Sequence, residues 1–181
     1  VTFGRQELVR RLRAAGLKEQ RWLFPFPDYK LPSCILSEAA VEGDQVDFSP
    51  LISASVVADP QTPPAFRFSL EQAWQPVFRN GLAGELANSF LVIAGREAMP
   101  VVDDKVLAWH YAVERAPHFC KSVDFVRGPS HVDVLPRLLM DAKSVAGCAS
   151  TAPIELKLAP DVFSSGRLWQ LELYRRLNVP G

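Results

Sequence analysis

Alternation of apolar and polar residues in the middle of the chain is the feature that most restricts its fold. In residues 105–114 every second position carries an apolar or aromatic side chain, namely Leu107, Trp109, Tyr111 and Val113. Successive side chains of a β-strand point to opposite sides, so this pattern predicts a strand with one apolar face. Residues 119–126 alternate again after a short turn at Ala116-Pro117. The two runs predict an antiparallel hairpin.

Periodicity and helix-capping residues predict the remaining elements. Residues 4–16 have the spacing of an amphipathic helix, and Gly16 is placed to end it. Ser69 is a suitable cap for a second helix, and residues 138–145 and 166–177 are also predicted to be helical. Predicted strands cover residues 21–26, 89–95, 131–135 and 154–158.

Two of these segments carry more specific expectations. Residues 89–95 form a continuous apolar run, which is typical of a strand buried on both faces. Residues 37–65 contain several prolines and read as a long loop, part of which we expect to be a lid or an inserted surface. The whole pattern predicts an α+β fold, with a mostly antiparallel sheet and flanking helices on one side.

Composition and charge exclude several classes of protein. The 181 residues are 48% hydrophobic and 22% charged, which is ordinary for a globular protein with its own core. Twenty basic and 20 acidic side chains cancel, so nucleic acid is not an expected partner. No apolar run reaches the roughly 20 residues of a membrane span. The three cysteines, Cys34, Cys120 and Cys148, are too widely spaced for a disulfide framework, and we expect a cytoplasmic location.

Three strings carry a resemblance to a known family. They are Ala14-Ala15-Gly16-Leu17 at the end of an Arg-rich helix, Trp22-Leu23-Phe24-Pro25-Phe26-Pro27-Asp28-Tyr29-Lys30-Leu31-Pro32, and Ala87-Asn88-Ser89-Phe90-Leu91-Val92. The first part of the chain resembles the C-terminal region of a class I S-adenosylmethionine-dependent methyltransferase. The second and third strings resemble methyltransferase-containing proteins of bacterial surface-polysaccharide synthesis.

The resemblance implies a division of the chain and a set of partners. Residues 1–36 would be the closing elements of a Rossmann-like methyltransferase sheet, 37–160 a β-rich module, and 161–181 a C-terminal helix that starts a further domain. The chain begins with Val1, and it lacks the glycine-rich donor loop of the family. We therefore expect a piece of a longer polypeptide that holds no cofactor itself, whereas its parent would use S-adenosylmethionine. An upstream methyltransferase domain and a downstream glycan-modifying domain are the implied partners.

An incomplete sheet also predicts contacts between copies of the chain. A sheet that lacks some of its strands leaves the backbone groups of an edge strand unpaired. We therefore expect a homo-oligomer formed by pairing at that edge.

A proline-flanked loop supplies the first candidate binding residues, Asp28, Tyr29 and Lys30. Prolines limit the entropy that is lost when such a loop holds a ligand. In this interpretation Asp28 accepts a hydroxyl proton and Tyr29 orients a sugar. In the alternative interpretation Tyr29 packs on Trp22 and the charged groups are solvated.

Polar and aromatic residues further along the chain supply the other candidates. Asn88 and Ser89 precede a predicted strand, where they would either line a cleft or cap the backbone. Trp109 and Tyr111, together with Phe119, offer flat apolar surfaces that suit a sugar ring. The alternative is that this aromatic set is simply core.

Histidine and cysteine give no catalytic assignment. His110, His118 and His131 have no zinc-binding spacing, and His110 is predicted on the strand face opposite the aromatic set. Cys120 lies two residues after His118, so a thiol hydrolase is one reading and a structural thiol the other.

Three functions remain open at this point. The first is an inactive methyltransferase fragment that supplies the surface for a glycan or lipid-linked saccharide acceptor. The second is a stand-alone interaction or carbohydrate-binding module, and the third is the hydrolase.

Overall fold

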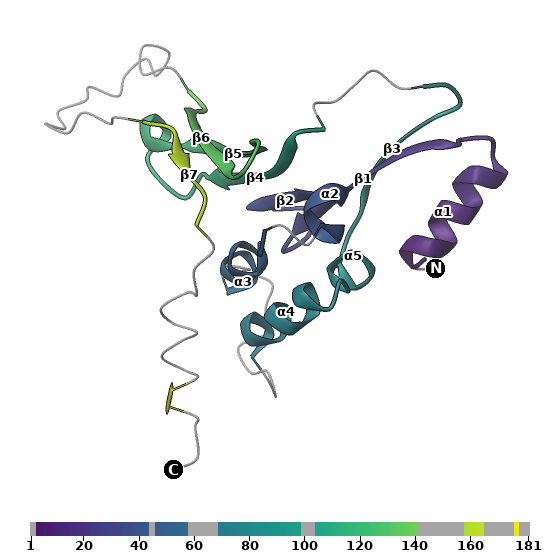
Figure 1. Ribbon diagram of the computed structural model, residues 1–181, viewed down its shortest axis with the longest axis horizontal. Coiled ribbons are helices and arrows are strands. Elements are labelled where there is room, and N and C mark those ends of the chain that lie inside the picture. The colour runs from purple at the N-terminus through teal and green to yellow at the C-terminus, as the bar shows by residue number, and fades with distance from the viewer. Residues whose placement is uncertain are drawn as a thin grey trace, which may run out of the picture.

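The computed structural model describes residues 3–43, 46–57, 69–98, 104–140, 158–164 and 176–177 (Figure 1). Its helices are α1 (Arg5–Ala14), α2 (Glu38–Glu42), α3 (Ser49–Val57), α4 (Leu70–Arg79), α5 (Ala83–Leu86) and a 3₁₀ turn η1 (Pro117–Phe119). Its strands are β1 (Glu19–Phe26), β2 (Cys34–Ser37), β3 (Leu91–Gly95), β4 (Val106–Ala112), β5 (Lys121–Arg127), β6 (Val132–Leu138) and β7 (Asp161–Val162). These strands form a seven-stranded sheet in the order β3-β1-β2-β4-β5-β6-β7.

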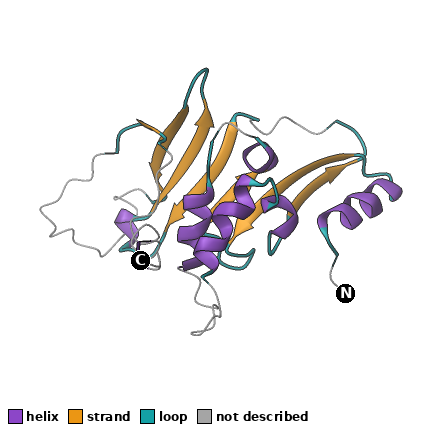
Figure 2. Cartoon of the chain, turned by 60° about the horizontal axis from the view of Figure 1, so that its bottom comes forward, coloured by secondary structure: helices purple, strands orange, loops and turns teal. Residues whose placement is uncertain are grey.

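Each neighbouring pair of these strands is antiparallel. Helices α3, α4 and α5 lie together on one side of the sheet, as Figures 1 and 2 both show. The predicted α+β fold with an antiparallel sheet and flanking helices is therefore confirmed.

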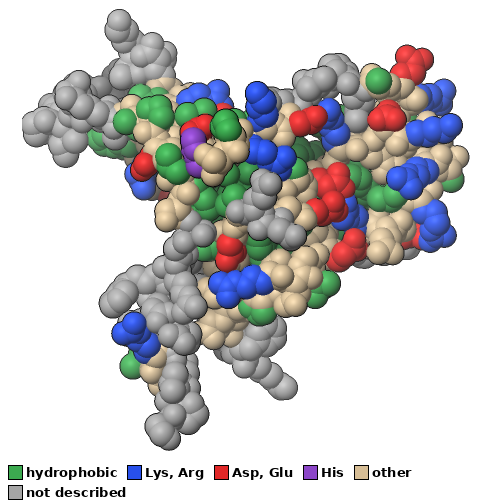
Figure 3. All heavy atoms as spheres, viewed as in Figure 1, with side chains coloured by type: hydrophobic (Ala, Val, Ile, Leu, Met, Phe, Trp, Pro, Cys, Tyr) green, Lys and Arg blue, Asp and Glu red, His purple; other side chains and the backbone are tan. Residues whose placement is uncertain are grey.

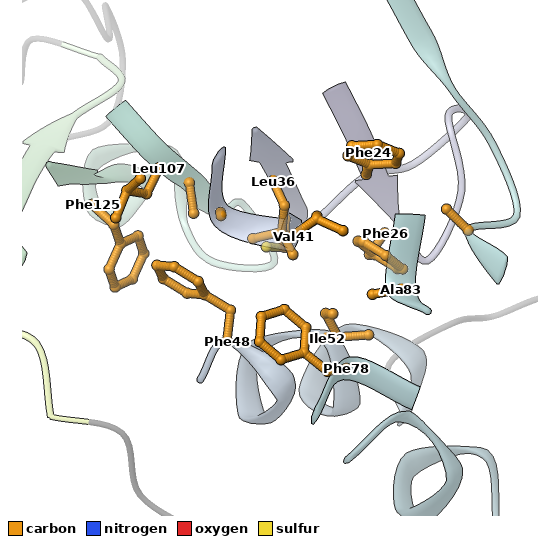
Figure 4. Packing of buried hydrophobic residues seen from close by; sticks show 14 of the residues in the cluster. Phe24, Phe26, Leu36, Val41, Phe48, Ile52, Phe78, Ala83, Leu107 and Phe125 are labelled. Carbon is orange, nitrogen blue, oxygen red and sulfur yellow. The ribbon is translucent and has the colours of Figure 1, made fainter. Parts of the chain in front are cut away.

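The core lies between the sheet and this layer of helices. Phe48 and Ile52 on the α3 side and Phe78 of α4 point toward Leu36 and Phe125 on the strands (Figure 4). The Phe48 ring meets the Phe125 ring edge to face, with the ring centroids 5.8 Å apart. Burial of each of these large apolar side chains contributes about 1.5–3 kcal/mol, so they hold the helical layer against the sheet.

Alternating aromatic residues place strand β1 in this core. Trp22, Phe24 and Phe26 are 3%, 0% and 1% exposed. Phe90 packs edge to face against both Trp22 and Phe24, with centroids 5.8 and 6.2 Å apart. Phe26 packs in the same way on Trp74 of α4. The strand predicted at residues 21–26 is confirmed because every second side chain reaches the helical layer.

The predicted N-terminal helix and its glycine stop are also confirmed. Gly16 has a φ of 84°, the left-handed conformation that ends a helix at little cost for glycine. Leu8, Val9 and Leu12 pack partly against the core. They hold α1 on the same side of the sheet as the other helices.

The predicted loop over residues 37–65 is wrong in its first two thirds. Ser37 accepts a hydrogen bond from the Ala40 amide at 3.3 Å and thereby caps α2. Asp47 accepts from the Ser49 amide at 2.9 Å, where α3 begins. The serines of α3 mask its apolar character in the sequence, but its Ile52 is fully buried. Residues 58–65 lie outside the described residues.

The predicted burial of the strand at residues 89–95 on both faces is wrong. The strand begins at Leu91, and β3 lies at one edge of the described sheet. Leu91 is 48% exposed and Ile93 is 40% exposed. Their sequence pattern is that of a strand covered on both faces, but both side chains point to the side of the sheet that carries none of the described helices.

The other predicted elements have mixed outcomes. The hairpin is confirmed as β4 and β5, the strand at residues 131–135 as β6, and the helix capped by Ser69 as α4. The helix predicted at residues 138–145 is wrong at its start, because Leu138 belongs to β6. Residues 141–145, 154–157 and all but two residues of 166–177 lie outside the described part of the chain.

The predicted domain boundaries stay predictions. Strand β2 pairs with β1 on one side and with β4 on the other. One continuous sheet therefore crosses the boundary predicted between residues 36 and 37.

Candidate functional site

One face of the sheet is left uncovered by the described helices. Residues directly opposite in neighbouring strands share a face. The fully buried Leu36, Ala108 and Phe125 are such partners on the helix side. The opposite side, which we call the open face, carries half-buried residues of the central strands: Leu23, Ile35, Trp109, Tyr111, Asp124 and Leu135.

Two rows of side chains run across β4, β5 and β6 on the open face. The first row is Trp109, Asp124 and Leu135, and the second is Tyr111, Ser122 and Arg137. Rows of this kind place side chains about 5 Å apart across the strands. Trp109 therefore lies beside the Asp124 carboxylate, and Tyr111 lies beside Ser122, with Arg137 on the next strand of the same row.

Only one of the two oxygens of the Asp124 carboxylate accepts a hydrogen bond from the described residues. Arg137 donates to Asp124 Oδ2 at 2.8 Å, and the Asp124 side chain is 16% exposed. Within the described residues, Asp124 Oδ1 is buried and accepts no hydrogen bond. A buried carboxylate oxygen without a donor is rare in native proteins, and a ligand hydroxyl is one group that would satisfy it.

The same surroundings further stabilise the neutral form of the Tyr111 phenol. Burial raises the pKa of the Tyr111 phenol, and the nearby Asp124 carboxylate raises it further. A neutral phenol offers a hydroxyl that both donates and accepts. Tyr111 is thus suited to hydrogen bonding with a polyhydroxylated ligand.

A cleft adjoins Trp109 where β2 ends. Beyond Ser37 the chain turns into α2, so β1 and β4 have no strand between them there. The cleft has a volume of about 390 Å³. Its apolar lining includes Leu23, Ile93, Val106 and Trp109.

Charged groups surround this β2 cleft. Arg21 of β1 donates to Asp104 Oδ1 at 2.6 Å, which joins β1 to the segment before β4. Glu38 and Glu42 of α2 and Arg127 of β5 also line the cleft. Polar groups of both signs around an apolar floor are the usual composition of a small-ligand site.

A second cavity, of about 500 Å³, lies under α1 and has a mainly structural character. It is lined by Arg5, Gln6, Val9, Arg13, Lys18, Glu19, Gln20, Trp22, Glu38 and Glu85. Arg5 occupies it, in ion pairs with Glu38 and with Glu42, the latter at 2.8 Å. The Arg5 guanidinium also stacks on Phe24, 5.5 Å from the ring centroid. These contacts tie α1, α2 and β1 together.

The loop residues Asp28, Tyr29 and Lys30 lie at the turn between β1 and β2. Asp28 Oδ1 accepts from the Lys30 and Leu31 amides at 2.7 and 3.3 Å, so this oxygen stabilises the turn. Tyr29 is 65% exposed, which corrects the alternative that it packs on Trp22. The Lys30 ammonium lies 6.0 Å from the Tyr29 ring centroid.

The structure brings this loop next to the second candidate group. The Tyr29 amide donates to Ser89 Oγ at 3.4 Å, and Asn88 is exposed beside it. The loop also approaches β4, because the Tyr111 amide donates to the Ser33 carbonyl oxygen at 2.8 Å. Asp28 to Lys30 thus adjoin the Tyr111 end of the open face.

The aromatic set is divided by the structure. Trp109 and Tyr111 share the open face, whereas Phe119 ends the turn η1 outside strand β4. His110 lies on the helix side opposite Cys34, as predicted. Burial lowers the pKa of His110, and Lys121 and Arg115 lower it further.

The contacts of Cys120 do not support the thiol hydrolase hypothesis. Its Sγ lies 3.5 Å from the carbonyl oxygens of Val113 and Arg115, where a thiol donates to backbone. The His118 side chain lies outside what the structure describes. In the described ranges, His, Cys, Asp and Glu form no cluster that could hold a metal ion.

Sequence reasoning missed Asp124, Arg137 and the lining of the β2 cleft other than Trp109. The available signal was a single acidic residue in the middle of the alternating run at residues 121–127. Its position beside Trp109 depends on the register of β4 and β5, which the sequence does not display.

Comparisons with protein-family models, curated proteins and solved structures give no match. Among the helices of the described residues, none has the length and hydropathy to cross a bilayer.

Proposed function

We propose that the open face binds a carbohydrate, with Trp109 as the stacking platform. The observation that carries this proposal is the half-buried position of Trp109 between the β2 cleft and Asp124. Sugar rings combine flat apolar C–H surfaces with hydroxyl groups around their edges. An aromatic ring satisfies the first feature, and carboxylate, guanidinium and phenol groups satisfy the second.

The polar groups are arranged in a way that suits hydroxyl recognition. Asp124 and Tyr111 lie on the same side of the strands as Trp109, and Arg137 holds one Asp124 oxygen. A hydroxyl that donates to Asp124 Oδ1 would satisfy the remaining oxygen. A ring stacked on Trp109 would lie close to these groups, because the rows are adjacent.

The saccharide is the methyl acceptor in the context that the family resemblance implies. The chain then supplies the acceptor side of a glycan-modifying methyltransferase, and S-adenosylmethionine binds to an upstream domain of the parent. The alternative context is a stand-alone carbohydrate-binding module. In the first context the full-length protein transfers a methyl group to the saccharide, and in the second it does not. The open face binds the saccharide in both.

Calorimetric titration of the chain with neutral and acidic oligosaccharides tests the proposal. We expect Trp109→Ala to weaken binding about tenfold, or about 1.4 kcal/mol, and Trp109→Phe to retain most of the affinity. Leu82→Ala is the matched control, because Leu82 is 47% exposed outside the open face. If no oligosaccharide binds the unaltered chain, or if both alanine variants lose affinity equally, the proposal is wrong.

A further inference from the structure

Strand β3 is an unprotected edge of the sheet. It pairs with β1 over five consecutive positions, from Leu91 opposite Leu23 to Gly95 opposite Glu19. Its other side has no strand neighbour among the described residues. Within the described part of the chain, the backbone N–H and C=O groups on that side have no hydrogen-bond partner, so a further strand could pair with them.

Native edge strands usually carry a feature that prevents such pairing. Short length, a charged side chain, proline or a bulge are the common features. Strand β7, at the opposite edge, has only two residues. Strand β3 has five residues, all of them apolar or glycine, and its register with β1 has no shift.

The side chains of β3 are also apolar on both of its faces. Leu91 and Ile93 lie on the open face and are 48% and 40% exposed, while Val92 and Ala94 lie on the helix side. A continuous apolar run is typical of a strand whose two faces are both covered. At the edge of the described sheet, the apolar side chains of β3 therefore remain partly exposed to solvent.

We propose that β3 pairs antiparallel with β3 of a second copy of this chain. Antiparallel pairing about a two-fold axis uses the same strand twice and forms a closed dimer. A register centred on Ile93 places the flanking Arg96 opposite Phe90 and Glu97 opposite Ser89. No like charges then oppose each other, and the apolar residues of both faces continue across the junction.

The oligomeric state of the full chain tests this dimer. Size-exclusion chromatography with light scattering should give twice the single-chain mass, with dissociation on dilution. The double variant Leu91→Lys with Ile93→Lys should be monomeric, because charges on an edge strand prevent pairing. The matched control is Leu82→Lys with Leu86→Lys, since these leucines are 47% and 55% exposed away from the edge. The control should remain dimeric.

Hydrogen exchange locates the contact. Amides of residues 91–95 should exchange more slowly at high protein concentration than on dilution. A monomer at every concentration, a dimer that survives in the Leu91 and Ile93 variant, or concentration-dependent protection elsewhere in the chain overturns the proposal. Circular dichroism of each variant confirms that the fold is retained.

Discussion

Trp109 on β4 and Asp124 on β5 stand directly opposite each other on the open face, and one oxygen of the Asp124 carboxylate is buried without a donor among the described residues. An apolar platform and an unsatisfied acceptor thus occur side by side. This pairing is the reason that the open face, and not the larger cavity under α1, is the candidate site. In that cavity Arg5 already meets carboxylates of the chain.

Asp124→Asn should weaken oligosaccharide binding while the fold is kept. A hydrogen bond to a charged group contributes about 1.5–3 kcal/mol, so we expect at least a tenfold rise in Kd by calorimetry. Thermal stability should change little, because the Arg137 side chain is 66% exposed and the Asn side-chain oxygen can still accept its hydrogen bond. Asp161→Asn on β7 is the control, since Asp161 is exposed and stands opposite Val134, which packs against the core on the other side of the sheet. Equal losses in both variants would count against a role for Asp124.

Arg5→Ala should destabilise the protein much more than Arg10→Ala. The Arg5 side chain is 14% exposed and pairs with Glu38 and Glu42, whereas the Arg10 side chain is 75% exposed. Loss of Arg5 leaves carboxylates without their partner, and we expect about 1.5–3 kcal/mol from urea unfolding. Arg10→Ala should change the free energy of unfolding by less than about 0.5 kcal/mol. Similar values for the two variants would show that Arg5 does not hold α1 to α2.

The thiol of Cys34 should be protected in the folded protein. Cys34 is fully buried, and burial raises the pKa of its thiol far above the usual value. Only the thiolate reacts readily, so alkylation with iodoacetamide should be negligible until denaturant is added. Cys120 is half exposed and should be modified first. Peptide mass spectrometry distinguishes the sites, and rapid native modification of Cys34 would contradict its position in the core.

Stability should fall as the pH decreases through the range where a free histidine titrates. The pKa of His110 is lowered in the folded state by burial and by Lys121 and Arg115. Below about pH 6.5 the unfolded chain takes up a proton that folded His110 resists, so the free energy of unfolding decreases. Above about pH 6.5 the free energy of unfolding is therefore not reduced by His110. It decreases as the pH falls from there toward the lowered pKa of His110 in the folded protein.

The variant His110→Gln isolates this effect. Its free energy of unfolding should vary less with pH between about 7.5 and 5.5, because one proton contributes at most about 1.4 kcal/mol per pH unit. Urea unfolding at several pH values measures the difference. An identical pH dependence in both proteins would exclude His110 as its source.

Much of the local structure was predictable from the residues. The aromatic run of β1, the alternation in β4 and β5 and the glycine after α1 are local signals, and these four elements occur as predicted. Helix α3 was not predictable in this way, because Ser49, Ser53 and Ser55 interrupt its apolar pattern although all three are buried. The Ser55 hydroxyl donates to the Leu51 carbonyl oxygen within the helix at 3.0 Å, and it accepts from the distant Ser33 hydroxyl at 2.8 Å only in the folded chain.

The candidate site was predictable only in part. Trp109 and Tyr111 were identified from their shared strand face, and the structure places both outside the core. Leu107, predicted on the same face, is buried in the core beside a register shift in β4. Asp28, Tyr29, Lys30 and Asn88 lie at a loop beside the Tyr111 end, and nothing in the described contacts joins them directly to Trp109. Asp124 and Arg137 belong to the site only because of the register in which β5 pairs with β4 and β6 pairs with β5.

The sequence by itself determined that the segments of β1, β3, β4, β5 and β6 are strands, because apolar runs and side-chain alternation are local properties of the chain. It did not identify β2, the strand that joins β1 to β4. The tertiary structure alone decided the order of the strands, the edge position of β3 and the placement of Asp124 opposite Trp109. Strand pairing relies on backbone hydrogen bonds that are nearly independent of side-chain identity. Its partners and register are therefore set by packing of the whole core.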